Sequence, residues 1–314
     1  MFEYNYNPKL CILNICLPKM LKYDFKFMDD MTELIAYIMD NKRGYKEIRI
    51  SCKSEPVYDK MCKAYIFNVL RYLSKKRKVL WSYELNRVIT SSVNTTSGSK
   101  FTAIDLQKAV YTEELNDYRF GKDENVKKPV EEIAKIIVEK NISIGRETLK
   151  EFLTTTIGEI FSNAFLHSDK DELFFIYDIE KVDKDYFLCV TVIDYGNTIV
   201  QNVKTYFEEE AEEDISSEDC ISWAIVNGNT TRKGSGGYGL PTLINYIERA
   251  KGELIILSGD VYYRLKEQKT QISKLKGFFA GTSVTFRIKL FETGNIIWYD
   301  KDNEKLISIS LESL

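Results

Sequence analysis

Apolar and polar residues follow two different periods along the chain, and these periods predict its secondary structure. In the first part, short apolar or alternating runs predict three strands, at residues 10–17, 48–52 and 79–85. Apolar positions at helical spacing predict helices between them, at residues 29–41 and 61–73. The resulting order, in which strands and helices alternate, predicts a small α/β module over residues 1–90.

A second α/β pattern follows a polar stretch (SSVNTTSGSK) at residues 91–100. We expect residues 91–145 to be a linker with connecting helices, one of which begins at Pro129, because proline is favoured at the first helical position. A longer helix is predicted at residues 146–167. Strands are then predicted at residues 172–179, 186–193, 253–258, 261–265 and 282–290.

The segment between the second and third of these strands contains an acidic run, EEEAEEDISSED, at residues 208–219. A charge run of this kind is usually a solvated surface, so we predict that it is mobile. Short helices are predicted at residues 221–226 and 240–251. The tail is predicted to form a hairpin over residues 296–309 that turns at residues 301–304.

Composition and charge set limits on the class of protein. The 314 residues are enough for two domains, and a net charge of −3 gives no overall basic field, so nucleic acid is not an expected partner. The six cysteines form no CxxC pair, which indicates reduced, buried thiols. No apolar run approaches the ~20 residues that span a bilayer, and no leader pattern opens the chain. We therefore expect a cytoplasmic protein without a membrane segment.

Candidate chemistry begins in the stretch IGEIFSNAFLHS at residues 157–168, where Glu159 and Asn163 are four residues apart. On a helix, these two side chains lie one turn apart on the same face. A carboxylate beside an amide oxygen can hold a hydrated magnesium ion and orient a water molecule. Taken alone, the pair is more often an ordinary solvent-facing feature of a helix.

Three further motifs follow in a fixed order. Asp194-Tyr195-Gly196 ends a predicted strand, GSGGYGL at residues 234–240 opens a predicted helix, and Gly281-Thr282 begins the last strand of the second block. Each has an ordinary explanation on its own, since aspartate and glycine favour turns and a single glycine cluster is often only a flexible joint. Their order makes a shared site the better interpretation.

The sequence of motifs, E-x-x-x-N, D-x-G, a long excursion, a glycine-rich loop and G-T, resembles the GHKL superfamily of ATPase domains, which includes gyrase B, certain chaperones, histidine kinases and MutL-type repair proteins. The resemblance covers residues 146–290. It implies an α/β sandwich of the Bergerat type, a mixed sheet covered by helices on one face, over residues 146–295, with ATP and Mg²⁺ as cofactors and residues 296–314 as a C-terminal hairpin. Residues 1–90 are loosely similar to the STAS-like segment that precedes some bacterial ATPase domains, without a diagnostic residue.

The resemblance implies a role for each motif residue. Glu159 would be the general base that orients the attacking water, and Asn163 the magnesium ligand. Asp194 would accept a hydrogen bond from the exocyclic amino group of adenine, and Gly196 would allow the backbone to approach the base. Thr282 would support the adenine through its hydroxyl group and a bound water.

The phosphates would lie at the glycine-rich loop, where backbone N–H groups at a helix start favour anions. Arg232 and Lys233 precede the loop and are the cations placed to contact a γ-phosphate. Leu240 begins the helix after the loop and completes the nucleotide-binding set. The loop glycines of that set are Gly236, Gly237 and Gly239.

The chain departs from the family pattern at two positions. Thr198 stands where the family usually has a second glycine after Asp194-Tyr195-Gly196, and Ser235 stands where a first loop glycine is common. We expect the β-carbon of Thr198 to narrow the base pocket or shift the loop, which would make nucleotide affinity modest. Neither change removes a group that performs chemistry.

His167 is the only histidine of the chain. A sensor histidine kinase requires a phospho-accepting histidine on a separate dimerising helix pair, and His167 instead lies at the end of the helix that carries Glu159. Histidine autokinase activity is therefore not expected. For His167 itself, a packed or helix-capping role is the better interpretation than a catalytic one.

These observations predict a slow Mg²⁺-dependent ATPase whose nucleotide state controls a lid, a homodimer or a protein partner. One alternative is a serine/threonine protein kinase like the anti-sigma-factor kinases, which would use the same pocket to phosphorylate a partner protein. Another is a module that binds nucleotide without turnover.

Overall fold

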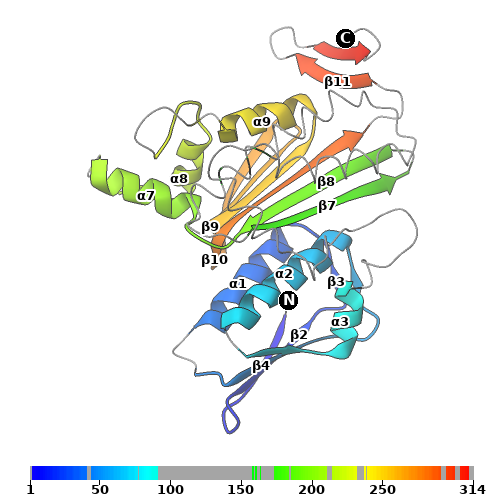
Figure 1. Ribbon diagram of the computed structural model, residues 1–314, viewed down its shortest axis with the longest axis vertical. Coiled ribbons are helices and arrows are strands. Elements are labelled where there is room, and N and C mark those ends of the chain that lie inside the picture. Colours follow the sequence, from blue (N-terminus) through cyan, green and yellow to red (C-terminus); the bar gives the residue numbers. More distant parts are fainter. Residues whose placement is uncertain are drawn as a thin grey trace. The chain divides into compact units, whose positions relative to one another are not determined.

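The computed structural model describes residues 2–40, 44–76, 78–90, 158, 160, 163, 173–183, 185–210, 214–231, 237, 239–290, 295–300 and 305–310. The chain divides into two compact units (Figure 1). The first unit comprises Met1–Ala103 together with Leu275–Phe279, and the second comprises Ile104–Lys274 and Ala280–Leu314. Both units combine sheets with helices, so the predicted α/β class is confirmed.

The first unit is built on a four-stranded sheet in the order β1-β2-β4-β6. β1 pairs antiparallel with β2, whereas β2, β4 and β6 are parallel to one another. Helices α1 and α2 form the crossover connections between the parallel strands. The bounds of these elements are β1 Glu3–Asn7, β2 Ile12–Leu17, α1 Phe25–Met39, β4 Glu47–Cys52, α2 Lys60–Lys76 and β6 Val79–Trp81. A two-stranded parallel sheet, β3 (Met20–Leu21) with β5 (Val57–Tyr58), completes the unit with α3 (Tyr83–Thr90).

Alternation along β2 and β4 buries every second side chain of each strand, and α1 and α2 lie on the same side of this sheet (Figure 1). α1 begins where the Asp24 carboxylate accepts the N–H of Phe27 at 2.9 Å, which is a helix N-cap. The strand predicted at residues 79–85 is too long. The Ser82 hydroxyl accepts the N–H of Leu85 at 3.1 Å and caps α3, so β6 stops at Trp81.

The second unit contains a four-stranded sheet in the order β7-β8-β10-β9. The described registers, β7 with β8 and β8 with β10, are antiparallel. Helices α7, α8 and α9 lie on one side of this sheet (Figure 1). The strands are β7 Leu173–Val182, β8 Asp185–Asp194, β9 Glu253–Lys266 and β10 Lys269–Leu290, and the helices are α7 Ile199–Glu210, α8 Ser217–Ala224 and α9 Gly239–Arg249. The predicted C-terminal hairpin is present as β11 (Asn295–Asp300) and β12 (Lys305–Ser310).

The core of the second unit lies between this sheet and its helices. Every second residue belongs to it from Leu188 to Val192 of β8 and from Val284 to Leu290 of β10, which is the pattern of a strand with one face against helices. Among its members are Leu188, Val190 and Val192 of β8, Val284, Phe286, Ile288 and Leu290 of β10, and Val203, Ile221, Leu243 and Ile247 of the helices.

Strands β9 and β10 differ from the strands predicted for this part of the chain. The strands predicted at 253–258 and 261–265 are one strand, β9, in which the core-facing positions change from Leu254 and Ile256 to Val261 and Tyr263. An extra residue produces such a change, and the φ of +63° at Gly259 fits a glycine bulge. The first half of β10 was not predicted, because its residues are largely polar.

The acidic run at residues 208–219 was predicted to be mobile, but both of its ends are helical. α7 extends to Glu210, and α8 starts after Ser216, whose hydroxyl accepts the N–H of Asp219 at 3.1 Å. α7 was not predicted, because only Val200 and Val203 are buried on it and its apolar pattern is weak.

All six cysteines are free. Cys52, Cys62, Cys189 and Cys220 are buried, as predicted, whereas Cys11 and Cys16 are half-buried. Burial raises the pKa of the Cys220 thiol to about 11, which keeps it protonated and unreactive near neutral pH. None of the described helices is both long and apolar enough to cross a membrane.

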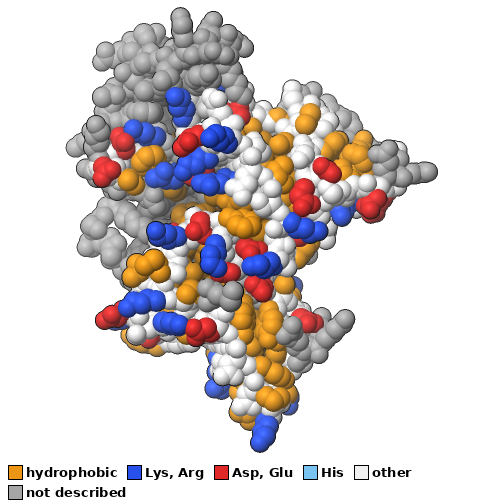
Figure 2. Space-filling view, turned by 180° about the vertical axis from the view of Figure 1, so that it is seen from behind, with side chains coloured by type: hydrophobic (Ala, Val, Ile, Leu, Met, Phe, Trp, Pro, Cys, Tyr) orange, Lys and Arg blue, Asp and Glu red, His pale blue; other side chains and the backbone are white. Residues whose placement is uncertain are grey.

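Charged side chains of both signs are interspersed over the described surface shown in Figure 2. Ion pairs along β8, β9 and β10 show the same mixture: Lys274 lies 3.4 Å from Asp260, and Lys289 lies 2.7 Å from Asp185. Such partly exposed pairs contribute little stability individually.

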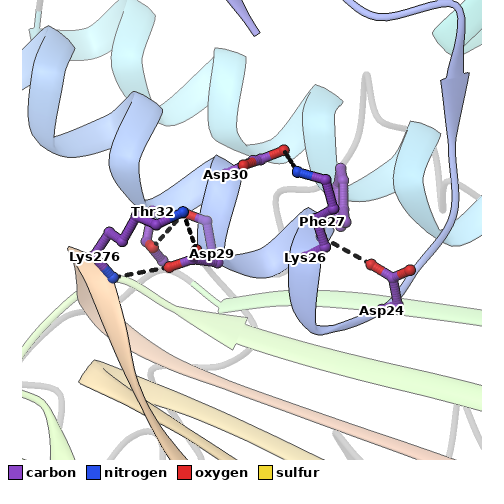
Figure 3. Close-up of polar contacts among 7 residues, drawn as sticks. All are labelled: Asp24, Lys26, Phe27, Asp29, Asp30, Thr32 and Lys276. Carbon is purple, nitrogen blue, oxygen red and sulfur yellow. Dashed lines mark hydrogen bonds and ion pairs between the residues drawn. The ribbon is translucent and has the colours of Figure 1, made fainter. Parts of the chain in front are cut away.

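The segment Leu275–Phe279 of β10 is held on α1 by Asp29 (Figure 3). The Asp29 carboxylate is 6% exposed and accepts the backbone N–H of Lys276 at 2.8 Å, while its other oxygen lies 2.8 Å from Lys276 Nζ. Gly277 lies so close to the backbone of Thr32 and Glu33 that an added Cβ would overlap it. α1 and this segment are therefore in close backbone contact.

We expect Asp29→Ala to lower the free energy of unfolding by about 1–3 kcal/mol, because it leaves the N–H of Lys276 without its buried acceptor. Lys276→Ala is the matched control, since it removes an ammonium group that is 61% exposed but keeps the backbone bond. The decrease in the free energy of unfolding should be smaller for Lys276→Ala than for Asp29→Ala. Urea denaturation measures both, and an equal or larger loss for Lys276→Ala would contradict the assignment of the backbone bond as the main contact.

Candidate functional site

Three polar side chains lie at one end of the sheet in the second unit, on the face that the helices cover. Asp194 follows Leu188, Val190 and Val192 at the same alternation on β8, and Thr282 precedes Val284 in the same way on β10. Asp194 and Thr282 are direct partners in the antiparallel register, so their side chains lie on one face. Ser258 of β9 joins them, with its Oγ 3.0 Å from the Oγ1 of Thr282.

Asp194 has a buried carboxylate, and one of its two oxygens accepts no hydrogen bond from the described residues. Its side chain is 5% exposed, and among the described residues no group hydrogen-bonds its Oδ1. Burial raises the pKa of Asp194 well above its ordinary value, and the backbone N–H of Thr282, which hydrogen-bonds the carboxylate, lowers it only in part. A buried acceptor without a donor is costly, which makes Asp194 a candidate for ligand recognition.

Gly281 is required where β10 passes the end of β8. A Cβ at Gly281 would overlap the carbonyl oxygen of Asp194 and lie 2.8 Å from the Cα of Tyr195. Only glycine permits this approach of two backbones. The Gly281-Thr282 motif therefore has a defined local role, which is to bring the Thr282 N–H against the Asp194 carboxylate.

Ser258 was not identified from the sequence. Its side chain is fully buried, and its Oγ accepts the N–H of Ile199, the first residue of α7, at 2.8 Å. The same Oγ lies 3.4 Å from the carbonyl oxygen of Gly281. Ser258 thus connects the start of α7 to the Gly281-Thr282 segment. A serine in an apolar strand pattern, ELIILS, was the only available signal.

Thr198 caps α7. Its Oγ1 accepts the N–H of Gln201 at 2.9 Å, and the Gln201 side chain accepts the N–H of Thr198 at 3.0 Å. This reciprocal pair is a capping box, and the T-x-x-Q spacing could have revealed it. Thr198 is fully buried in this role, which gives a structural reason for a threonine where the family pattern has glycine. Its effect on nucleotide affinity stays a prediction.

The described part of the glycine-rich loop is held by a neighbouring turn. Gly237 has a φ of +80°, and its carbonyl oxygen accepts the N–H of Gly228 at 3.1 Å. A Cβ at Gly237 would overlap the backbone of Asn229, whose side chain donates to the carbonyl oxygen of Trp223 at 2.9 Å. α9 begins two residues later, at Gly239, and Leu240 is half-buried against the core.

The helix predicted to carry the catalytic pair is described at three positions. Gly158, Ile160 and Asn163 are helical. Ile160 is buried in the core of the second unit, and Asn163, three residues later on the same helix surface, is half-buried. Gly196 is also half-buried, two residues beyond Asp194. The predicted site residues that lie outside the described part of the chain are Glu159, Arg232, Lys233 and Gly236, as are His167 and Ser235.

Comparison of the sequence with known proteins does not assign the chain to a family. No family model matches the chain, and no curated protein matches it.

The site places one buried acceptor, Asp194 Oδ1, beside two hydroxyl groups, those of Thr282 and Ser258. Asp194 Oδ1 can accept a hydrogen bond from an N–H donor, and the Thr282 hydroxyl beside it can donate or accept one. Because the carboxylate is shielded from water, a donor that reaches it does not compete with solvent, and the bond is stronger than on the surface. The row of polar side chains formed by Asp194, Thr282 and Ser258 is therefore suited to recognising a flat, hydrogen-bonding group.

Proposed function

We propose that the second unit is an ATP-binding domain of the GHKL type, with a Bergerat-type sandwich, that binds Mg²⁺-ATP and hydrolyses it slowly. The first unit would then be a module that receives or transmits a signal, and nucleotide state would control a lid, a homodimer or a protein partner. Free cysteines suit the reducing environment of the cytoplasm, where we expect the protein to act.

The observation that carries this proposal is the buried, partly unsatisfied carboxylate of Asp194. Adenine presents an exocyclic amino group that donates to such an acceptor. Guanine presents a carbonyl oxygen at the corresponding position, and two acceptors facing each other would repel. Asp194 would therefore favour adenine over guanine.

Other features support the phosphate end of the site. The positive φ of Gly237 and the start of α9 at Gly239 suit a loop that presents backbone N–H groups at a helix N-terminus. Asn163 is half-buried beside the core, and its amide oxygen is of the type that Mg²⁺ accepts. When bound, Mg²⁺ would neutralise charge on the phosphates, while Glu159 would orient and deprotonate the attacking water.

The experiment that tests the reaction follows the γ-phosphate of labelled ATP with the wild type and Glu159→Ala. We expect the variant to bind Mg²⁺-ATP with unchanged affinity and to release free phosphate about 10²–10⁴-fold more slowly, because it lacks the general base. Glu151→Ala is a control on the same predicted helix outside the motif and should leave both quantities unchanged.

Two outcomes would change the proposed reaction. Label that passes to a partner protein instead of appearing as free phosphate would support a serine/threonine kinase of the anti-sigma-factor type. Binding without any release of phosphate by the wild type would support a non-hydrolysing module.

A further inference from the structure

The turn that follows α8 is held to that helix by Asn229. Asn229 Nδ2 lies 2.9 Å from the carbonyl oxygen of Trp223, which also accepts the N–H of Val226 at 3.1 Å. A backbone carbonyl oxygen can only accept hydrogen bonds, so the amide nitrogen of Asn229 is the atom that faces it. The backbone N–H of Asn229 donates to the carbonyl oxygen of Val226 at 3.2 Å. Side chain and backbone of Asn229 therefore both fix the turn on the end of α8.

α8 is a well-packed support for this turn. Cys220 and Ile221 of α8 are buried in the core of the second unit. The Trp223 ring packs against two rings of α7, with centroid distances of 5.3 Å to Tyr206 and 5.7 Å to Phe207. Because close-packed side chains resist displacement, the carbonyl oxygen that the turn uses has a defined position.

Gly237 of the glycine-rich loop lies directly against the turn. Its carbonyl oxygen accepts the N–H of Gly228 at 3.1 Å, and a Cβ added to Gly237 would overlap the carbonyl oxygen of Asn229. Gly237 can come this close only because it has no side chain. A shift of the Gly228–Asn229 peptide group would therefore move Gly237 as well.

The backbone at Gly237 leads into the start of α9. The first N–H groups of a helix have no partner inside the helix, and in α9 they include those of Gly239 and Leu240, whereas Pro241 has no N–H. In the proposed ATP site these groups face the phosphates. Their direction depends on the conformation of Gly237, whose φ is +80°.

We propose that Asn229 is a positioning residue that holds the glycine-rich loop in the conformation that binds the phosphates of ATP. This proposal rests on the proposed ATP site. Asn229 acts through the Gly228–Asn229 peptide group and Gly237, whereas the base is recognised by Asp194. Asn229 therefore contributes to the part of the affinity that comes from the phosphates and not to the part that comes from adenine.

The test compares the affinity for Mg²⁺-ATP with the affinity for adenosine, which has the same base and no phosphate. Asn229→Ala removes the donor to Trp223 and should weaken binding of Mg²⁺-ATP about tenfold, the value of one hydrogen bond to a charged group, while the affinity for adenosine stays unchanged. Calorimetric titration of the full chain measures both affinities. Asn227→Ala is the matched control, because Asn227 lies in the same turn with an exposed side chain, and it should change neither affinity.

Asn229→Asp separates the lost donor from a lost volume. Aspartate keeps the size of the side chain and lacks the amide donor, so it should show the same selective loss. Alanine adds no charge and aspartate leaves no gap, so a loss shared by both variants comes from the missing donor. If Asn229→Ala does not fold, Asn229→Asp and the wild type are compared in about 1 M salt, which screens the added charge. A selective loss that persists there supports the inference, and one that disappears overturns it.

The remaining results also have distinct meanings. Equal weakening of Mg²⁺-ATP and adenosine binding, no change in either, or a selective loss in only one of the two folded variants would overturn the inference and leave the ATP site standing. If the wild type bound adenosine as tightly as Mg²⁺-ATP, the glycine-rich loop would not be a phosphate site and the inference would fail. If the wild type bound neither, the proposed function itself would fail, and the inference with it.

Discussion

Replacing Asp194 with asparagine should stabilise the nucleotide-free protein and, at the same time, weaken its affinity for ATP by about 10–100-fold, the value of a hydrogen bond to a charged group. Burial holds the pKa of Asp194 above its unfolded value, so Asp194 opposes folding at neutral pH, where the unfolded chain carries it as a free carboxylate. Asparagine removes this ionisable group and, with it, the carboxylate that would accept the adenine amino group. Urea denaturation and nucleotide titration of the two proteins measure both effects.

The stability difference should depend on pH with a defined sign. Because the folded protein binds the Asp194 proton more tightly than the unfolded chain, the wild type gains stability as the pH falls through the raised pKa of Asp194. The advantage of Asp194→Asn should therefore shrink as the pH is lowered. ATP affinity of the wild type should fall over the same range, since the protonated carboxyl group is a poorer acceptor.

Asp185→Asn is the matched control for this variant. Asp185 begins the strand that Asp194 ends, and it forms a partly exposed ion pair with Lys289 at 2.7 Å. It should alter neither stability nor ATP affinity by more than a small amount. A loss of stability in Asp194→Asn at neutral pH would contradict the assignment of Asp194 as a buried charge kept for binding.

Gly281→Ala should lower the free energy of unfolding by about 1–3 kcal/mol, because the new Cβ overlaps the carbonyl oxygen of Asp194 and the two strands must separate. The same displacement moves the Thr282 N–H away from the carboxylate, so ATP affinity should also fall. Thermal or urea unfolding, followed by nucleotide titration of the folded protein, tests both parts.

Ser283→Ala is the control for this position. Ser283 is buried, and among the described residues its hydroxyl has no hydrogen-bond partner, so its removal should be neutral or slightly stabilising. If Gly281→Ala were as stable as Ser283→Ala and retained ATP affinity, the close approach of β10 to Asp194 would not matter to the site.

The strands and helices with strong periodic patterns were predictable, and so was the position of Asp194 at a strand end. The pairing of Asp194 with Thr282 was not predictable, because it depends on the register between β8 and β10. The two residues are 88 positions apart in the sequence (282 − 194). Ser258 was missed for the same reason, since its role exists only when β9 lies beside β10.

Other misses have local causes. The bulge at Gly259 changes which residues of β9 face the core, and in the sequence that change looks like a break between two strands. Thr198 was interpreted through the family pattern as a lost glycine, although its spacing to Gln201 also marks a helix start. A pattern borrowed from a family can thus hide a simpler local signal.

Calorimetric titration of the full chain with Mg²⁺-ATP and Mg²⁺-GTP tests most directly whether the Asp194 carboxylate recognises adenine in an ATP site. We predict that ATP binds at least about tenfold more tightly than GTP, because only adenine donates to Asp194. Equal affinities for the two nucleotides, or no binding of ATP, would contradict the claim.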